Sequence, residues 1–275
     1  MSFYRKAVRC VCAISLVLTG TAVAADAAES PYKPKIGQKG KDVVWIPSPE
    51  AMVEKMLDMA HVTAQDLVID LGSGDGRNVI AAAKRGARAL GVEYNPDLVT
   101  YSRRAAALAG VGDRATFVQG DMYEADISQA SALILFLIPY NLMKLAPKFV
   151  ALKPGTRIVS NTYEIGGGWE PDETDRLQPC LTWCVAYLYI VPAKVEGTWA
   201  LPQGELTLEQ SFQKLTGVHE LEGIRVPIEN GTLRGNEIRF TINQTEYTGR
   251  VNGASMEGIA RGRITSTWTA KRVAE

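Results

Sequence analysis

The sequence contains few of the residues that usually bind metals. It has only two histidines, His61 and His219, which lie far apart, and its four cysteines form no Cys-x-x-Cys pair. Protein zinc sites need several such ligands at short, characteristic spacings. We therefore expect no metal site in this protein.

The chain also has no excess of either charge. Its 275 residues include 30 Lys and Arg and 30 Asp and Glu, which leaves no net charge. It has no long basic stripe, which is the usual mark of a nucleic-acid-binding protein. We therefore expect no nucleic-acid partner. The length allows one large domain or two smaller ones.

No apolar run reaches the roughly 20 residues that a membrane-spanning helix needs. The apolar run near the N-terminus covers only residues 10–24; Arg5, Lys6 and Arg9 precede it, and small residues follow it. This layout predicts a signal peptide over residues 1–25, export to the periplasm or the exterior, and no stable membrane span after cleavage. The alternatives are an uncleaved N-terminal anchor and a misassigned start codon.

After such a cleavage only Cys180 and Cys184 would remain. On one strand they would lie about 13 Å apart, which is too far for a disulfide. A turn around Pro179 would bring them together, so the sequence leaves their pairing open.

The most informative run, residues 67–77, reads Leu-Val-Ile-Asp-Leu-Gly-Ser-Gly-Asp-Gly-Arg. It predicts a buried strand, a tight glycine turn and the start of a helix, an arrangement that brings backbone close to a ligand. The Gly-x-Gly-x-Gly spacing and the acids disfavour a dinucleotide and favour a ligand with positive charge, such as S-adenosylmethionine (SAM). The predicted cofactor residues here are Asp70, Gly72, Ser73, Gly74, Asp75 and Gly76.

Two further acids follow predicted strands. Glu93 ends the next strand, where a carboxylate can accept hydrogen bonds from both ribose hydroxyls. Asp121 follows a third strand and can accept from an adenine amino group, while Met122 can pack on the ring. The alternative is that both acids cap helices, and Asn95-Pro96 does resemble a helix start.

Strand and helix patterns alternate along the first part of the chain. This βαβ repetition predicts an α/β fold, a doubly wound, mainly parallel Rossmann-like sheet over residues 42–192, with the ligand at the carboxyl ends of its strands. Ser48 is the expected cap of a first helix, with Pro49 at its first position. Residues 181–191 read as a buried strand of the same sheet. The other expected elements are strands 67–71, 88–92, 115–118, 132–137 and 156–163, and helices 78–85, 96–109 and 140–150.

Residues 193–275 have no helical period. Alternating runs separated by Asn230-Gly231, Arg234-Gly-Asn236 and Asn252-Gly253 predict a small antiparallel β domain, a meander or barrel whose core Trp199 and Trp268 could close. This unit is either a stabilising appendage or a platform for a substrate or partner.

Residues 42–172 resemble class I SAM-dependent methyltransferases. The glycine run, together with Gly-Val-Glu-Tyr-Asn-Pro-Asp-Leu-Val and Ser-Arg-Arg-Ala, is similar to protein-lysine methyltransferases of the ATP synthase c-subunit and the adenine nucleotide translocase. Ile-Pro-Ser-Pro-Glu and Leu-Lys-Pro-Gly-Thr-Arg-Ile-Val-Ser match bacterial relatives without an assigned substrate. The resemblance implies SAM as cofactor and this fold, and says less about the methyl acceptor.

The run Phe-Leu-Ile-Pro-Tyr-Asn, residues 136–141, falls where the methyl group should point. It is distantly similar to the Asn/Asp-Pro-Pro-Tyr loop of amino-group methyltransferases, although Ile138 stands where that loop has a polar residue. Tyr140 could orient an amine and Asn141 could accept from it; equally, they could be a packed aromatic and a helix cap. Asn161 and Glu164 are further candidates, and no general base stands out.

The sequence therefore predicts a methyltransferase acting on an amine, either a protein lysine or a small amine. The alternative is an exported protein that kept the SAM fold without turnover and uses its C-terminal unit as a binding platform. Export conflicts with turnover because SAM is made in the cytosol.

Overall fold

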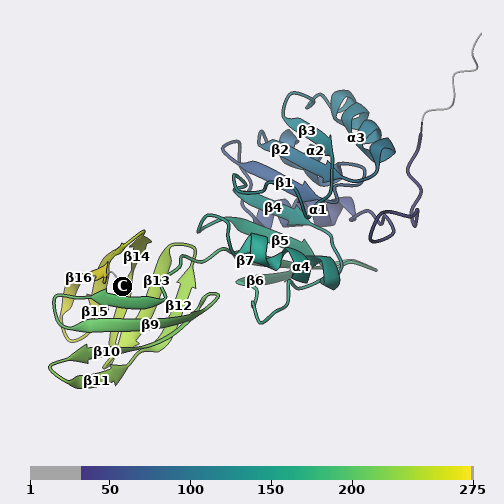
Figure 1. Ribbon diagram of the computed structural model, residues 1–275. Helices are drawn as coiled ribbons and strands as arrows, with labels where there is room; N and C mark the ends of the chain where they lie inside the picture. The colour runs from purple at the N-terminus through teal and green to yellow at the C-terminus, as the bar shows by residue number, and fades with distance from the viewer. Residues whose placement is uncertain (1–31, 274–275) are drawn as a thin grey trace, which may run out of the picture. The chain divides into compact units, whose positions relative to one another are not determined.

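The computed structural model describes residues 32–273 (Figure 1). The predicted signal peptide lies outside the described residues. The described chain contains an α/β part with a seven-stranded mixed sheet and an all-β part with a nine-stranded antiparallel sheet. Among these residues, no helix has the length and apolar character needed to cross a membrane.

The seven-stranded sheet has the order β3-β2-β1-β4-β5-β7-β6. Strands β1 to β5 run parallel to one another, and β7 runs antiparallel to both β5 and β6. Its strands are β1 (Leu67–Leu71), β2 (Arg88–Glu93), β3 (Ala115–Gln119), β4 (Ala132–Leu135), β5 (Arg157–Asn161), β6 (Glu173–Arg176) and β7 (Val185–Ile190). The helices are α1 (Glu50–Met59), α2 (Arg77–Lys84), α3 (Pro96–Leu108) and α4 (Pro139–Phe149).

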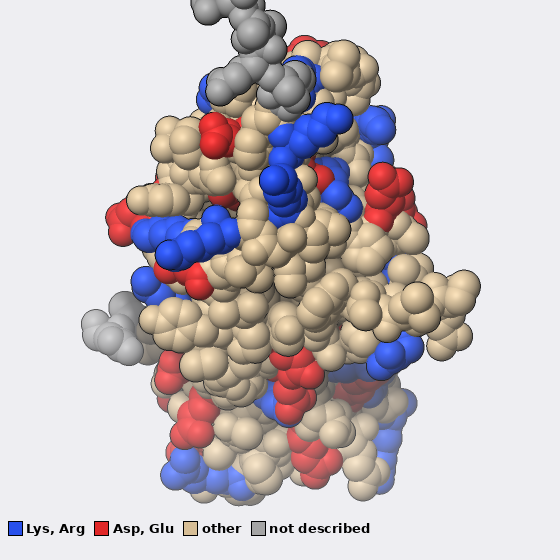
Figure 2. All heavy atoms as spheres, turned by 90° about the vertical axis from the view of Figure 1, so that its right-hand side faces the viewer, with Lys and Arg blue, Asp and Glu red and all other residues tan. Residues whose placement is uncertain are grey.

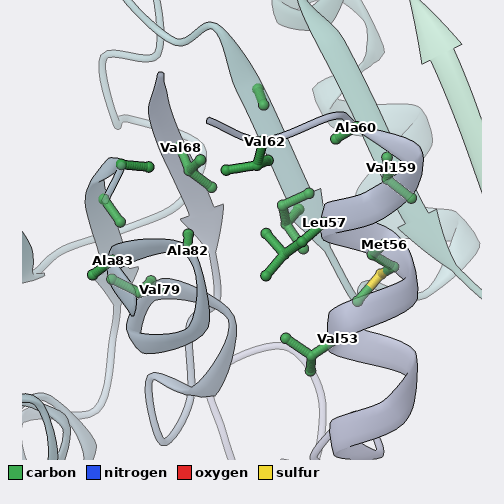
Figure 3. Close-up of a cluster of buried hydrophobic side chains, with 14 of the residues drawn as sticks. Val53, Met56, Leu57, Ala60, Val62, Val68, Val79, Ala82, Ala83 and Val159 are labelled. Carbon is green, nitrogen blue, oxygen red and sulfur yellow. The ribbon is translucent and has the colours of Figure 1, made fainter. Parts of the chain in front are cut away.

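Both faces of this sheet are covered, which explains why its central strands are apolar almost throughout. Val68 of β1 belongs to a core cluster with α1, α2 and α3, whereas the next residue, Ile69, belongs to a cluster with α4. In Figure 3, the side chains of Val53 and Leu57 on α1 point toward Val68 of β1 and Ala82 of α2.

Several element boundaries differ from the expected ones. The strand expected over 132–137 ends at Leu135, and the strand expected to reach 163 ends at Asn161. Helix α1 starts at Glu50 with Pro49 as N-cap, so Ser48 is not the cap; its hydroxyl instead accepts from Asn161 Nδ2 at 3.1 Å. Strand β6 was not predicted because its sequence, Glu-Thr-Asp-Arg, is polar and largely exposed.

The strand expected over residues 181–191 is shorter than predicted. Strand β7 begins at Val185, and Leu181 is fully exposed rather than buried. Residues before β7 form a turn in which Cys180 and Cys184 are joined by a disulfide, with their Cα atoms 5.7 Å apart. The turn that the sequence left open is therefore present.

The second sheet closes on itself. Strands β8, β9, β10 and β12 to β16 form a ring, closed by the pairs β8–β16 and β9–β10, and β11 pairs with β10 alone. The strands are β8 (Gly197–Ala200), β9 (Glu205–Ser211), β10 (Lys214–Leu221), β11 (Ile224–Pro227), β12 (Glu229–Arg234), β13 (Glu237–Ile242), β14 (Thr245–Asn252), β15 (Ser255–Arg261) and β16 (Thr265–Arg272).

The interior of this barrel is filled by side chains. Trp199 and Trp268, predicted to close the core, are both buried in one cluster with Phe240. Two of the three predicted turns are present, at Gly235 and at Gly253. The prediction at Asn230-Gly231 was wrong, because these residues lie inside β12 at a register shift against β13, where a bulge accommodates them.

The predicted division into residues 42–192 and 193–275 falls between β7 of the first sheet and β8 of the second. It stays a prediction, because the chain from Tyr32 onward forms one compact unit. The Phe212 ring stacks on the Trp169 ring with centroids 5.4 Å apart, and Lys214 pairs with Glu170 at 2.6 Å.

Candidate active site

A cleft opens at the carboxyl ends of the parallel strands, where ligands of open α/β sheets bind. Gly72 follows β1, Glu93 ends β2, Asp121 follows β3 and Leu137 follows β4, and all four line this cleft. Met122 lines it as well. The sequence thus correctly grouped residues that are far apart in the chain.

The glycine loop is built on left-handed backbone. Gly72, Gly74 and Gly76 have φ values of +75°, +55° and +82°. A β-carbon at Gly74 would lie 2.3 Å from the Trp45 Nε1, and one at Gly76 would lie 2.7 Å from the Phe117 ring. Gly74 and Gly76 therefore need glycine both for conformation and for space, and Gly72 needs it for conformation.

Glu93 is held by the two loops on either side of it. Its Oε2 accepts from the Gly74 N–H and its Oε1 accepts from the Asn95 N–H, each at 2.9 Å. The side chain is 9% exposed and still lines the cleft. Backbone donors thus fix the carboxylate in a position where its remaining lone pairs can accept from a ligand.

Asp121 already has a cationic partner. Its carboxylate accepts from Lys41 Nζ at 2.6 Å and from the Tyr123 N–H at 3.0 Å. The hydrogen bond with Lys41, followed by that from Tyr123, lowers the pKa of Asp121. Lys41 also lies 5.1 Å from the centre of the Tyr94 ring. An adenine amino group would therefore share Asp121 with Lys41.

The other predicted loop residues lie beneath or beside the cleft rather than on its wall. Asp70 is 2% exposed and accepts from Asn78 Nδ2 at 3.0 Å. Burial raises the pKa of Asp70 well above its usual value, and the charges of Glu93 and Asp75 add to this. Asp75 pairs with Arg77 at 2.6 Å, and Ser73 is buried.

A segment that the sequence analysis did not single out covers part of the site. Residues 38–46 line the cleft, and they form a hairpin in which Gly37 N–H donates to Trp45 O and Trp45 N–H donates to Gln38 O. Two glycines close together in sequence, Gly37 and Gly40, were the available turn signal. Lys41 and Trp45 bring this hairpin to Asp121 and Gly74.

The two predicted catalytic residues do not line the cleft. Tyr140 is 66% exposed, and Asn141 is fully buried with its Nδ2 donating to the Tyr123 hydroxyl at 2.7 Å. Asn161 is buried on Ser48, and Glu164 is exposed. The cleft wall beyond the cofactor residues is instead formed by Phe136, Ile138, Tyr163 and Trp183.

Comparison with known proteins identifies the family. A family model described as the ANTKMT methyltransferase domain matches residues 70–173. The chain is 40% identical over 152 residues to a protein-lysine N-methyltransferase of Saccharolobus islandicus, covering 54% of this chain and 94% of that protein. It is 38% identical over 131 residues to the mouse lysine N-methyltransferase named for the ATP synthase c-subunit. That match covers 47% of this chain and 52% of the mouse protein.

A solved structure of similar sequence is also a methyltransferase. An RNA methyltransferase from Salinibacter ruber, in complex with S-adenosyl-L-homocysteine, is 42% identical with a TM-score of 0.51, covering 55% of this chain and 96% of that one. The chain belongs to this family of SAM-dependent methyltransferases. The family match ends at residue 173, before the barrel strands begin.

The cleft of this methyltransferase fits its cofactor, SAM. Glu93 presents an oriented carboxylate where ribose hydroxyls can donate to it, and Gly72 offers backbone without a side chain. Met122 and Leu98 provide apolar wall for a ring beside Asp121. The cluster of acids complements the positive charge that SAM carries.

Proposed function

We propose that this methyltransferase transfers the methyl group of SAM to the side-chain amine of a lysine in a protein. The observation that carries the proposal is the 40% identity to a protein-lysine N-methyltransferase, almost all of which this chain covers. Relatives named for the ATP synthase c-subunit and the adenine nucleotide translocase add to it. These names do not specify which protein this chain methylates.

Methyl transfer needs little chemical assistance from the protein. SAM supplies a methyl carbon already activated by a positive sulfur. The lysine must first lose its ammonium proton; its nitrogen lone pair then forms the N–C bond while the C–S bond breaks and its electrons return to sulfur. The positive charge thereby moves from sulfur to nitrogen, so the main task is to align the amine and exclude water.

The cleft supports that task through its apolar wall. Phe136, Leu137 and Ile138 follow β4 and line the region beyond the cofactor residues. Tyr163 and Trp183 complete this part of the wall. Such a surface suits the aliphatic stem of a lysine, and the proton leaves to solvent before the amine enters.

RNA is the second candidate acceptor, because the Salinibacter structure carries that name. The balanced charge of the chain supports a protein acceptor instead. Figure 2 shows Lys, Arg, Asp and Glu side chains interspersed on one face, around a broad area without charge. A phosphate backbone is usually met by a continuous basic surface.

The test is to incubate the purified protein with SAM carrying an isotopic methyl label and with separate protein and RNA fractions of its host. We expect methyl-lysine in protein digests by mass spectrometry, and none with Glu93→Ala, which lacks the ribose acceptor. Label in RNA alone would contradict the lysine assignment. SAM binding without label in either fraction would support the non-catalytic alternative.

We also propose that the protein is exported, working in an oxidising compartment. The predicted signal peptide supports this, and so does the Cys180–Cys184 disulfide, because structural disulfides are rare in reducing cytosol. A reporter active only outside the cytosol, fused after residue 40, should be active. Full-length protein found only in the cytosol with residues 1–24 attached would contradict export.

The filled core of the β-barrel supports a stabilising role, or contact with a partner through its outer surface, over a ligand held inside it. Its other possible role, as a platform for the acceptor, is tested by truncation as described in the Discussion.

A further inference from the structure

Three aromatic side chains from separate segments meet where the cleft passes β4 and β5, on the other side of β1 from Glu93. The Trp183 ring centre lies 5.4 Å from that of Phe136 and 6.5 Å from that of Tyr163. The ring planes are tilted by 60° and 54°, so the rings lie at an angle to one another and are not stacked. All three line the same cleft as Glu93 and Asp121.

Trp183 reaches this wall from a short disulfide-closed loop. Cys180 and Cys184 close residues 180–184, and the Leu177 N–H donates to the Cys184 carbonyl at 2.8 Å. Trp183 has a φ of +59°, a left-handed conformation that a bulky residue adopts only when its surroundings hold it. In the same loop Leu181 is fully exposed, so the loop directs the tryptophan alone into the cleft.

We propose that Phe136, Tyr163 and Trp183 bind the amine of the acceptor lysine as a cation-binding aromatic wall, and that the disulfide presents Trp183 to it. The inference rests on the lysine acceptor proposed above. Aromatic faces attract cations, and they bind methylated ammonium well because it is weakly hydrated. The wall therefore faces the positive charge that appears on nitrogen during transfer and retains methylated lysine, which must release a proton to solvent before its nitrogen can accept a further methyl group.

The proposal predicts a preference for charge that can be measured without turnover. The probe is Nα-acetyl-trimethyllysine methylamide, added to protein saturated with S-adenosylhomocysteine and followed by tryptophan fluorescence and calorimetry. We expect it to bind about 2- to 30-fold more tightly than the neutral isostere with carbon in place of the charged nitrogen. Equal binding of the two compounds, or no detectable binding of the cation, would overturn the proposal.

Variants assign the effect to the wall. Trp183→Ala should abolish the preference, Trp183→Phe should retain most of it, and SAM affinity should be unchanged in both. Leu181→Ala is the matched control, because it changes an exposed apolar residue of the same loop. A full preference in folded Trp183→Ala would overturn the proposal.

The disulfide is tested by the double variant Cys180→Ser, Cys184→Ser. If the disulfide presents Trp183, this variant should lose most of the preference and keep wild-type SAM affinity. A full preference in this variant would overturn the role assigned to the disulfide.

The product distribution separates this inference from the proposed function. Wild type should yield di- and trimethyl-lysine, and Trp183→Ala should shift the product toward monomethyl-lysine. Lysine methylation with the same distribution in both proteins would overturn the aromatic wall and leave the lysine acceptor intact. Transfer to RNA alone would instead refute the acceptor, and the binding comparison would still decide the charge preference.

Discussion

The α/β part with the seven-stranded sheet and the β-barrel differ in whether their buried polar atoms have hydrogen-bond partners. Five buried side-chain atoms without a hydrogen-bond partner in the described protein all lie in the first part: Ser73 Oγ, Asn78 Oδ1, Asn141 Oδ1, Ser160 Oγ and Trp169 Nε1. Strands β8 to β16, all described, contain no such atom. There the Trp199 and Trp268 indoles donate to the Val195 and Thr248 carbonyls at 2.7 and 3.1 Å.

This difference in unpartnered polar atoms suggests that the first part holds a binding site and that the barrel acts as a scaffold. A buried polar group without a partner costs about 1–3 kcal/mol, so a fold retains it mainly where something else requires it. Ser73 lies in the glycine loop and Asn78 in the first turn of the helix that follows it, whereas the barrel interior is apolar and filled. We therefore expect substitutions at the sheet edge to affect binding, and substitutions in the barrel to affect only stability.

The largest effect is expected at Glu93. Glu93→Ala removes the carboxylate that we expect to accept from two ribose hydroxyls, and charged hydrogen bonds contribute about 1.5–3 kcal/mol each. SAM affinity by calorimetry should fall by about 100-fold or more. The structure adds that Glu93 also accepts from Gly74 and Asn95, so the variant should melt at lower temperature than wild type. Wild-type affinity in the variant would show that the ribose assignment is wrong.

A smaller effect is expected from Gly74→Ala, for which the barrel offers a matched control. Gly74 and Gly253 have φ values of +55° and +60°, so alanine strains the backbone similarly at both. Only at Gly74 would the new β-carbon meet Trp45; Gly253 has nothing within 4 Å. Gly74→Ala should therefore lose about 1–3 kcal/mol more stability by urea unfolding. Equal losses of stability in the two variants would mean that the hairpin carrying Trp45 moves aside at no measurable energetic cost.

The pH dependence of stability compares two buried acids. Burial raises the pKa of Asp70, so the folded protein holds a proton there that the unfolded chain releases, and stability falls as pH rises toward that raised pKa. Hydrogen bonds from Thr63, Arg157 and Ser131 outweigh burial and lower the pKa of Asp66, so its contribution is lost as pH falls.

Asp70→Asn should therefore reduce the decline in stability toward alkaline pH, whereas Asp66→Asn should reduce the decline toward acid pH. Urea unfolding from about pH 2 to pH 8 measures both slopes, because the contribution of Asp66 is lost below the ordinary pKa of an aspartate, about 3.9. An unchanged alkaline slope in Asp70→Asn would show that this carboxyl does not titrate as its burial implies.

The sequence predicted what depends on local pattern. Alternation of apolar runs located the helices and the parallel strands, and the glycines and acids at strand ends located Gly72, Glu93 and Asp121 on the cleft. These signals work because parallel strands bring their carboxyl ends to one edge whatever their separation in the chain.

It failed where the outcome depends on tertiary packing. Strand β6 is polar and has only β7 as a partner, so no apolar alternation marks it. Asn141 belongs to the predicted loop 136–141 and Trp183 to the strand predicted over residues 181–191, and nothing local shows that the first is buried while the second lines the cleft. The hairpin over the cleft likewise depends on contacts with Gly74 and Asp121.

The smallest effect on cofactor binding is expected from removing the barrel. Truncation after residue 192 deletes no residue that lines the cleft, so SAM affinity should stay within about twofold of wild type, provided that the new edge does not aggregate. It does remove Phe212 from the Trp169 ring and Lys214 from Glu170, so the melting temperature should fall. Phe212→Ala in the full chain is the control that removes the stacking alone.

Activity of the truncated protein then decides what the barrel does. Loss of methyl transfer to the protein acceptor with SAM binding intact indicates an acceptor platform, and retained transfer indicates a stabiliser. If the truncated protein is folded and soluble but no longer binds SAM, while Phe212→Ala still does, barrel residues other than Phe212 are needed for SAM binding. In that case residues 42–192 and 193–275 act as one domain, and the contrast between a binding sheet and an inert barrel is wrong.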